Sequence, residues 1–301
     1  MWHKRTDSML IGIVQGISLE YVIKIYPSRY GLFAGGYIGS IVDTTDKVTY
    51  ANELINTQGS GKIITQARYN MAGVNCSLYG LIAGGYASTI VTTTDKVIAA
   101  NELISAQGSG KILTQAKSGS RGVSFIVYGL IGGGSAGSIT TGTDKVVFST
   151  ELISAQGAGK VLTQARHNLA TANFQEFGLF SGGDTGSAKV TTTDKVVAAT
   201  ELISAQGSGK VLTQARRELG GISFTNYGLF SGGYTTGAVT TTDKVVAATE
   251  LISAQGSGKV LTQARNGVTG ISFLTYGLLG GGYTSSYVTT TDKVVAATEL
   301  I

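Results

Sequence analysis

The chain has 301 residues, of which 42% are apolar and only 14% charged, and its formal net charge is +5 at pH 7. This apolar share is enough for a sizeable core, and it excludes a disordered polyelectrolyte. The mild charge, without long Lys or Arg runs, argues against a nucleic-acid partner. The single cysteine, Cys76, excludes an intramolecular disulfide framework and fits a reducing compartment or a virus particle assembled in one.

The first 29 residues differ from the rest of the chain. Their apolar stretch, Met9 to Leu19, is shorter than the roughly 20 residues of a membrane span. Gln15 interrupts it and no small-residue cleavage site follows, so we expect neither a membrane anchor nor a secretory signal. Apolar residues stand mostly at alternate positions up to Ile25, which predicts β-strands.

A repeat organises everything that follows. The triplet TDK places its aspartate at intervals of 49 or 50 residues: Asp46, Asp95, Asp144, Asp194, Asp243 and Asp292. The segment Val190 to Arg216 recurs letter for letter as Val239 to Arg265. A unit of this length cannot bury its own apolar face. We therefore predict one domain, 1–301, with divergent strands over 1–29 and six repeat units over 30–301.

Each unit has the same parts in the same order, as the fifth unit illustrates. An aromatic-Gly-Leu strand begins at Tyr227 and ends at the doublet Gly232-Gly233, and a variable loop follows. The segment TDKVVAATELI reads as a strand, SAQGSGK as a turn, and KVLTQAR as the start of a further strand. A variable segment then leads into a GISF-like strand. Four strands per unit predict an all-β, six-bladed β-propeller with almost no helix.

We expect both ends of the chain to close the ring. An unclosed blade would leave a row of unpaired backbone groups. The segment around Met9 to Tyr26 should therefore supply the inner strand of the first blade and the outer strand of the last.

These residues resemble kelch repeats. In order, the fifth unit has Arg216, the GISF strand, Tyr227, Gly232-Gly233 and Glu250. Kelch units carry a Trp after the third strand, where this chain has Leu251-Ile252, so the likeness is to degenerate kelch-like arrays of bacteria and their phages. The resemblance covers residues 30–301. It implies a propeller used for binding or as a structural module, such as a phage tail or adhesion component. The Tyr–Cys crosslink and His ligands of related copper oxidases have no matching positions.

Motifs for catalysis, cofactors and metals are weak. GSGK at 108–111 lacks both the preceding Gly and the following Ser or Thr of a phosphate-binding loop, so it reads as a turn. His3, His167 and Cys76 are too few and too scattered for a tetrahedral metal site. We expect no cofactor, no metal and no enzyme activity.

Two windows differ most among the units, and they predict a binding face. One follows the Gly doublet and the other follows the QAR triplet, whereas GSGK hardly varies. We expect both windows on one face, and GSGK, taken as the turn between the third and fourth strands, on the other. The candidate residues on the variable face are Tyr37, Tyr86, Tyr234, Tyr283, Arg68, Lys117, Arg166, Arg216 and Arg265. The basic side chains could instead be structural, bonding to backbone carbonyls between blades.

The sequence favours a non-enzymatic module with a protein or glycan partner on that face, without a membrane. An anionic or glycan-like ligand would suit arginines and tyrosines. The alternative is a carbohydrate-active hydrolase or lyase with its site at the central channel. The unique acidic residues available for such a site are Asp43, Glu176, Asp184 and Glu218. The oligomeric state is left open.

Overall fold

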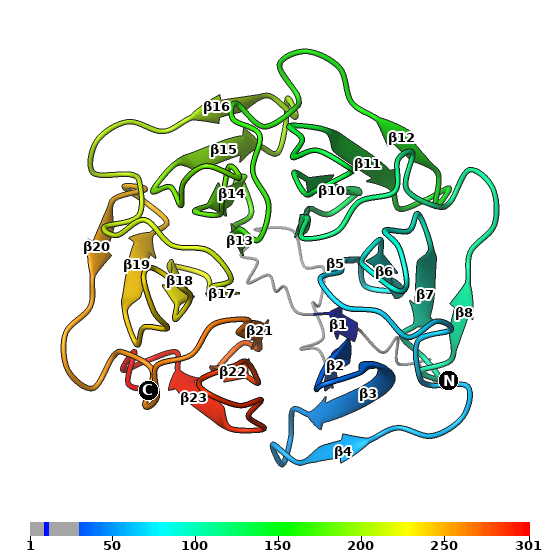
Figure 1. The fold of residues 1–301 in the computed structure, drawn as a ribbon, viewed down its shortest axis with the longest axis horizontal. Helices are drawn as coiled ribbons and strands as arrows, with labels where there is room; N and C mark the ends of the chain where they lie inside the picture. Colours follow the sequence, from blue (N-terminus) through cyan, green and yellow to red (C-terminus); the bar gives the residue numbers. More distant parts are fainter. Residues whose placement is uncertain (1–8, 12–29) are drawn as a thin grey trace, which may run out of the picture.

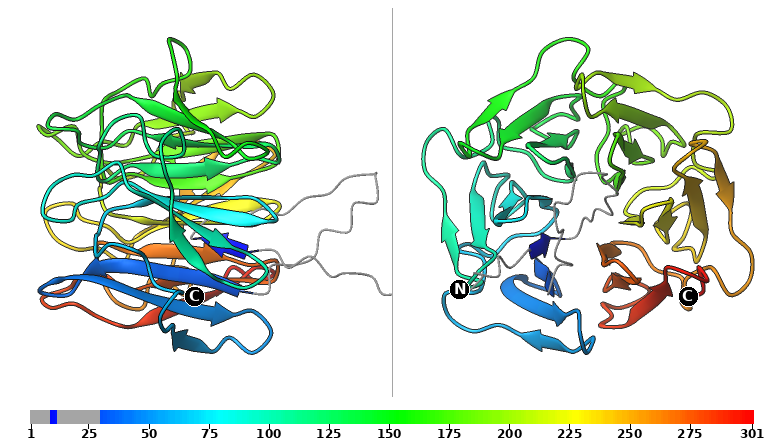
Figure 2. Two further views of the ribbon diagram at one scale, coloured as in Figure 1. Left: turned by 90° about the vertical axis from the view of Figure 1, so that its right-hand side faces the viewer. Right: turned by 180° about the vertical axis from the view of Figure 1, so that it is seen from behind.

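The computed structural model describes residues 9–11 and 30–301, which form a ring of six β-sheets around a central axis (Figure 1). Figure 2 shows the same ring from the side and from behind. No helix occurs in this part of the chain. The predicted six-bladed propeller, with a repeat of about 49 residues per blade, is confirmed.

Each sheet is one blade, and its strands follow one another in chain order from the axis to the rim. Blade by blade, the strands are β1 (Met9–Ile11), β2 (Tyr30–Tyr37), β3 (Ile41–Thr49), β4 (Ile55–Thr57); β5 (Ala72–Asn75), β6 (Tyr79–Ala83), β7 (Thr94–Ile98), β8 (Ile104–Ala106); β9 (Arg121–Ser124), β10 (Tyr128–Gly132), β11 (Thr143–Val147), β12 (Ile153–Ala155); β13 (Ala170–Asn173), β14 (Phe177–Ser181), β15 (Thr193–Val197), β16 (Ile203–Ala205); β17 (Gly220–Ser223), β18 (Tyr227–Ser231), β19 (Thr242–Val246), β20 (Ile252–Ala254); and β21 (Thr269–Ser272), β22 (Tyr276–Gly280), β23 (Thr291–Val295).

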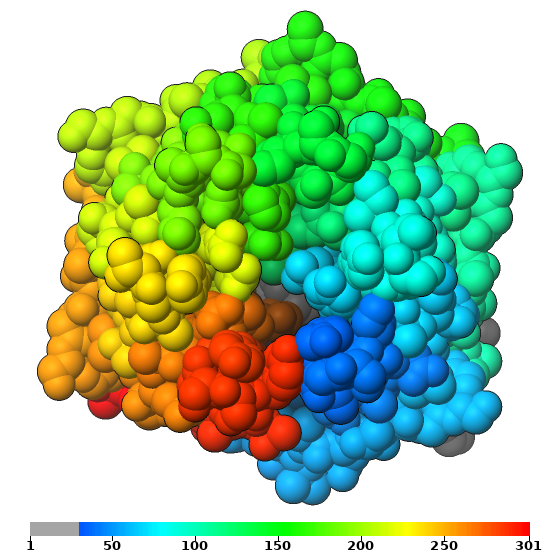
Figure 3. Space-filling view, viewed as in Figure 1, coloured from blue at the N-terminus to red at the C-terminus, as the bar shows by residue number. Residues whose placement is uncertain are grey.

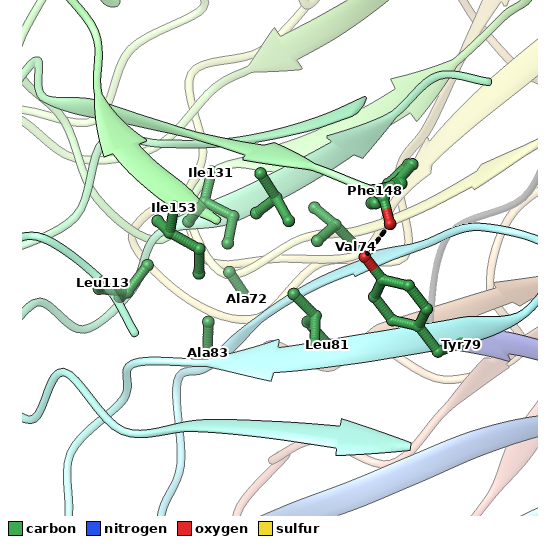
Figure 4. Close-up of a cluster of buried hydrophobic side chains, with 10 residues drawn as sticks. Ala72, Val74, Tyr79, Leu81, Ala83, Leu113, Ile131, Phe148 and Ile153 are labelled. Atoms are coloured by element: carbon green, nitrogen blue, oxygen red, sulfur yellow. Dashed lines mark hydrogen bonds between the residues drawn. The ribbon is translucent and has the colours of Figure 1, made fainter. Parts of the chain in front are cut away.

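The core lies between neighbouring blades. In the cluster shared by the second and third blades, Leu81 and Val74 pack against Ile131 and Phe148 (Figure 4). The Tyr79 hydroxyl donates a hydrogen bond of 2.9 Å to the backbone carbonyl of Phe148. Six such clusters occur among the described residues, one at each blade junction. Because every cluster needs both blades, a single repeat unit has no core of its own.

The Gly doublets are required by close packing at the junctions. Gly232 has a φ of 67°, and a Cβ built on it would lie 2.8 Å from the backbone oxygen of Arg265 in the connection to the next blade. An L-residue would therefore be strained both by its backbone conformation and by this contact. The doublet ends the second strand and lets the connecting segment pass against it.

The ring is closed between the sixth and first blades. Tyr276 stacks on Tyr50 at 5.5 Å, and its hydroxyl donates to the Tyr50 carbonyl over 3.2 Å. This is the contact that Tyr227 makes to Ala296 one junction earlier. Strand β1 supplies the inner strand of the first blade, as predicted. Met9 to Ile11 thus lies beside the inner strands of the second and sixth blades, β5 and β21.

Two features of the closure differ from the expectation of four antiparallel strands per blade. Strand β1 runs parallel to β2, and the sixth blade has three strands among the described residues. The predicted contribution of the segment around Met9 to Tyr26 to the outer strand of the sixth blade falls on residues 12–29, outside the described part of the chain.

The prediction for the fourth strand was wrong. TDKVVAATELI is not one strand: β19 ends at Val246, and a turn at residues 247–251 leads into β20, Ile252–Ala254. Glu250 lies in this turn with a φ of 61°, and its N–H donates to the Val246 carbonyl. KVLTQAR forms no strand because its backbone and side chains bind the next blade instead, as Thr213 does to Asp243 over 3.2 Å.

The turn glutamate is held by two lysines of the preceding unit. Glu201 accepts from Lys160 over 2.9 Å and also pairs with Lys145, whose ammonium lies 4.9 Å from the centre of the Tyr128 ring. The same arrangement recurs at five junctions, around Glu102, Glu151, Glu201, Glu250 and Glu299. These pairs explain why a glutamate occupies a left-handed position that favours glycine.

We predict that Glu201→Ala destabilises the protein more than Glu201→Gly, by roughly 1 kcal/mol, because both lose the ion pairs but only Gly relieves the left-handed backbone. Urea unfolding of the two variants measures the difference. Equal midpoints, or a more stable alanine variant, would contradict this account of the turn.

Acid should weaken these junctions. Burial raises the pKa of Glu201, but hydrogen bonds and charge from Lys145 and Lys160 outweigh it, so the pKa lies below its ordinary value of 4.5. A carboxyl with a lower pKa in the folded chain stabilises the fold fully above its ordinary value and loses that contribution as the pH falls. We therefore expect the unfolding free energy to fall between about pH 5 and pH 3. Glu201→Gln removes one of the five such contributions and should make the dependence correspondingly shallower, and unfolding curves across this range test it.

Candidate functional site

The two variable windows open on the same face, as predicted, and the structure also places them side by side. The residue after each basic residue of the QAR or QAK triplet forms an antiparallel bridge with the residue after the Gly doublet of the next blade. The bridged pairs are Tyr69 with Tyr86, Ser118 with Ser135, His167 with Asp184, Arg217 with Tyr234, and Asn266 with Tyr283. We call this surface the variable face.

The placement of GSGK was wrong. The segment does not join the third and fourth strands, which are connected by residues 247–251 in the fifth unit. It lies in the connection from one blade to the next, in the wide loops that follow β8, β12, β16 and β20 at the rim (Figure 1). The Gly209 carbonyl accepts from the Ile252 N–H of the next blade, and Lys210 pairs with Glu250 over 3.1 Å. GSGK is therefore constant because it binds the neighbouring blade.

The five basic candidates are buried between blades. Each pairs with the TDK aspartate of the next unit at 2.8–3.0 Å: Arg68 with Asp95, Lys117 with Asp144, Arg166 with Asp194, Arg216 with Asp243, and Arg265 with Asp292. All five are at most 2% exposed.

The guanidinium of Arg216 shows what these residues do. It donates to the carbonyls of Phe230 over 3.0 Å and Gly232 over 2.8 Å, besides its ion pair with Asp243. Burial lowers the pKa of Arg216, and the aspartate opposes that shift. These contacts match the structural alternative, in which the basic side chains bond to backbone carbonyls, and they leave no cation at the surface of the variable face from this set.

The tyrosine candidates are at the surface, and three of them belong to one cluster. Tyr37, Tyr86 and Tyr283 are 36–44% exposed. Tyr37 lies 5.6 Å from both Tyr69 and Tyr287, measured between ring centres.

The series continues outward from Tyr37 on both sides. Tyr69 lies 5.4 Å from Tyr86, and Tyr283 lies 5.1 Å from Tyr287. We call this series, Tyr283, Tyr287, Tyr37, Tyr69 and Tyr86, the tyrosine surface. It extends over the sixth, first and second blades, and Figure 3 shows the red sixth unit directly beside the blue first unit.

Sequence reasoning missed Tyr69 and Tyr287 as members of this surface. Both stand in the variable windows, and this position in the sequence could have identified them as residues of the variable face. What connects them is the closure of the ring, which brings residues near the two ends of the chain together.

Tyr234 lies in a different, charged part of the variable face. Lys189 is 5.2 Å and Arg217 5.5 Å from its ring centre. Arg217 also pairs with Asp184 at 2.9 Å and Glu218 at 3.4 Å. This tyrosine is therefore already in contact with cations, unlike those of the tyrosine surface.

The acidic candidates are not arranged as a general acid and base. Asp184 and Glu218 both contact Arg217. Glu176 lies in the β13–β14 turn on the opposite face, and Asp43 is exposed in β3. Burial raises the pKa of Asp184, but the Gly186 N–H and Arg217 outweigh it and hold the pKa below its usual range. A carboxyl held ionised in this way is unsuited to donate a proton. In the described part of the chain, no three His, Cys, Asp or Glu side chains gather as a metal site would need.

The inner strands consist mainly of small and apolar residues. The described inner strands carry one charged residue, Arg121, whose guanidinium donates to the Ser120 carbonyl over 2.9 Å. Toward the opposite face, the Asn173 Oδ1 accepts a hydrogen bond from the Ser124 N–H over 2.9 Å. The Asn173 N–H donates to the Ser223 hydroxyl, and the Ser223 N–H donates to the Ser272 hydroxyl, both over 2.8 Å. These bonds tie neighbouring inner strands together.

Comparison with known proteins gives no family. The sequence matches no protein-family model and no curated protein at a significant level. Within the described residues, no helix has the length and apolar character to cross a membrane.

We predict that Arg216→Ala lowers the unfolding free energy by about 3–5 kcal/mol, because it leaves Asp243 buried without its counter-charge. Arg216→Lys should cost less, since Lys117 fills the equivalent position in the second unit and reaches Asp144 over 2.9 Å. Denaturant unfolding of both variants is the measurement. A mild loss for the alanine variant would contradict a structural role.

Proposed function

We propose that this chain is a kelch-like propeller that acts as a non-enzymatic binding module, with the tyrosine surface as its binding site. The observation that carries the proposal is the convergence of five tyrosines from three different blades. No contact between blades requires them, because the equivalent positions elsewhere hold Ser118, Ser135, His167 and Asp184. Loops on a rigid scaffold that differ while the scaffold repeats are typical of binding surfaces.

A neutral glycan fits this surface better than an anion. Burial raises the pKa of Tyr69, as do the neighbouring Tyr86 and Tyr37, so its hydroxyl stays protonated at neutral pH. The five basic candidates are buried and therefore offer no positive charge to an anion. In the adjoining segments 37–44, 86–92 and 283–290, the one charged residue is Asp43, which is negative. Aromatic rings offer apolar faces to the C–H groups of sugars, and the phenolic hydroxyls add hydrogen bonds. A peptide segment is the protein ligand that would suit the same features.

The kelch resemblance supports the proposal through its shared parts. The basic residue before the inner strands β5, β9, β13, β17 and β21, the aromatic-Gly-Leu strand and the Gly doublet all lie at blade junctions here. These parts recur from unit to unit, whereas the loops after the doublets differ. A role in a phage tail or in bacterial adhesion rests on the resemblance alone.

The pairing of the acidic residues favours binding over hydrolysis. A glycosidase needs one carboxylic acid with a raised pKa and a second carboxylate at a set distance. Asp184 and Glu218, the two unique acids that come together, both bind Arg217 instead.

The test is a double substitution on the tyrosine surface. Tyr37→Ala with Tyr287→Ala should weaken glycan binding about tenfold or more, since each stacked ring contributes roughly 0.5–1.5 kcal/mol. Tyr37→Phe with Tyr287→Phe keeps the rings and should lose less. Binding is measured on a glycan array and then by titration with the best ligand.

Leu274→Ala provides the matched control, because this residue is 59% exposed in the β21–β22 turn on the opposite face. Its binding should equal that of the unchanged protein. Equal losses from the control and the tyrosine variants would remove the case for this surface. Release of reducing sugar from any bound glycan would overturn the non-enzymatic proposal.

A further inference from the structure

The tyrosine surface is one unbroken series of rings. From Tyr283 to Tyr86, the successive distances between ring centres are 5.1, 5.6, 5.6 and 5.4 Å, and neighbouring rings are tilted by 51–71°. Four of the rings are exposed, and the fifth, Tyr69, is half-buried. The variable face therefore offers a continuous aromatic strip to a ligand instead of one isolated ring.

The backbone holds three of these tyrosines at the same position of the same turn. Tyr37, Tyr86 and Tyr283 each follow a Gly doublet. In each loop, the N–H of the next residue donates to the carbonyl two positions further on, over 2.9–3.0 Å. Tyr86 is also bridged on both sides, to Tyr69 and to Ile90. A surface that is fixed in this way loses little conformational entropy when a ligand binds.

The series has two defined ends. In the third blade, the position equivalent to Tyr86 holds Ser135. In the fifth blade it holds Tyr234, whose ring contacts the cations of Lys189 and Arg217. Among the described residues, the aromatic strip is therefore confined to the sixth, first and second blades.

Exposed hydroxyl groups flank the rings. The three loops that carry the strip expose Ser40, Ser88, Thr89, Ser285 and Ser286. A hydroxyl both donates and accepts hydrogen bonds, so it can bind the hydroxyls of a sugar without adding charge. The surroundings thus suit a neutral, polyhydroxylated ligand along the length of the strip.

We propose that the tyrosine surface binds an internal stretch of an extended, linear, β-linked polysaccharide, with about one sugar over each ring. This inference rests on the proposed function and adds the shape and length of the glycan. The separation of neighbouring rings is close to the length of one sugar in an extended chain. A single sugar contacts one or two rings, whereas an extended chain contacts the whole series.

The open arrangement of the rings selects for the shape of the chain. Small ligands are usually held in concave pockets by a few convergent polar groups, but these rings lie on three different blades. β-1,4-linked chains of sugars with equatorial hydroxyls are extended and present apolar C–H faces along their length, which suit aromatic rings. α-1,4-linked chains of glucose coil, so few of their sugars contact the series at one time.

The first experiment measures the effect of chain length by calorimetric titration of the unchanged protein. The probes are β-1,4-linked oligosaccharides of glucose, xylose and N-acetylglucosamine, each from one to six sugars long. For at least one of these sets, we expect the affinity to rise about two- to tenfold with each added sugar and to level off at about five sugars. α-1,4-linked glucose oligosaccharides of the same lengths should gain no affinity with length.

The second experiment changes the two ends of the series. Tyr86→Ser and Tyr283→Ser introduce the residue that the third blade carries at Ser135, so the fold should tolerate them. Each should weaken binding of a six-sugar chain about two- to tenfold and leave the affinity for a two-sugar chain nearly unchanged. Tyr234→Ser is the matched control, because it makes the same change at the same position in the fifth blade, outside the series, and it should alter neither affinity.

The outcomes separate this inference from the proposed function. Glycan binding that does not depend on chain length would overturn the inference and leave the proposed function standing, as would equal binding of the α-linked oligosaccharides. Equal losses from Tyr234→Ser and the two end variants would also overturn it. If none of these oligosaccharides binds, the extended chain is wrong, and the glycan array decides the proposed function separately.

Discussion

The buried pair between a basic residue and the TDK aspartate is the interaction on which the ring depends. Taking two charges out of water costs several kcal/mol per ion, and this cost is offset only where geometry and hydrogen bonds are good. Here the Arg216 guanidinium meets both Asp243 and the carbonyls at the end of β18, while the Gly doublet leaves room for the crossing chain. One side chain thereby fixes a connection, the end of a strand and the neighbouring blade together.

This arrangement separates scaffold from surface. The outer connection is bound along its length to the next blade, through Lys210 to Glu250, Thr213 to Asp243 and Arg216 to Asp243. Its sequence is constrained at each of those points, so it hardly varies. The residues that follow this connection lie on the variable face and do not make these contacts. Tyr69 and Arg217 occupy equivalent places there, although their side chains are chemically unrelated. The tyrosine surface can exist because the structure beneath it does not depend on it.

The sequence predicted the parts of this fold that repetition determines. The period gave the number of blades, the Gly doublets the ends of the second strands, and the two variable windows their common face. It failed where side chains act at a distance along the chain. KVLTQAR looks like a strand, but Thr213 and Arg216 bind the next blade. The sequence left the basic residues open between a ligand site and a structural role. Their recurrence from unit to unit, together with a recurring aspartate, was a signal that the two could pair.

Other features depended on three-dimensional closure. The parallel direction of β1 has no local signal in Met9–Ile11. Tyr287 and Tyr37 are far apart in the chain, and only the completed ring places their rings at 5.6 Å. The exposure of Phe33 follows equally from its place at the sixth junction, since its local sequence resembles that of the buried Phe180.

The most direct test of the central claim, that a constant scaffold carries its binding site on the tyrosine surface, is NMR of ring-labelled tyrosine during titration with neutral oligosaccharides. The account predicts that a bound sugar shifts the signals of Tyr37, Tyr69, Tyr86, Tyr283 and Tyr287. The signals of Tyr50 and Tyr276, which stack at the opposite end of the sixth junction, should stay unchanged. Shifts confined to Tyr50 and Tyr276, or to Tyr234, would place the site elsewhere and contradict it.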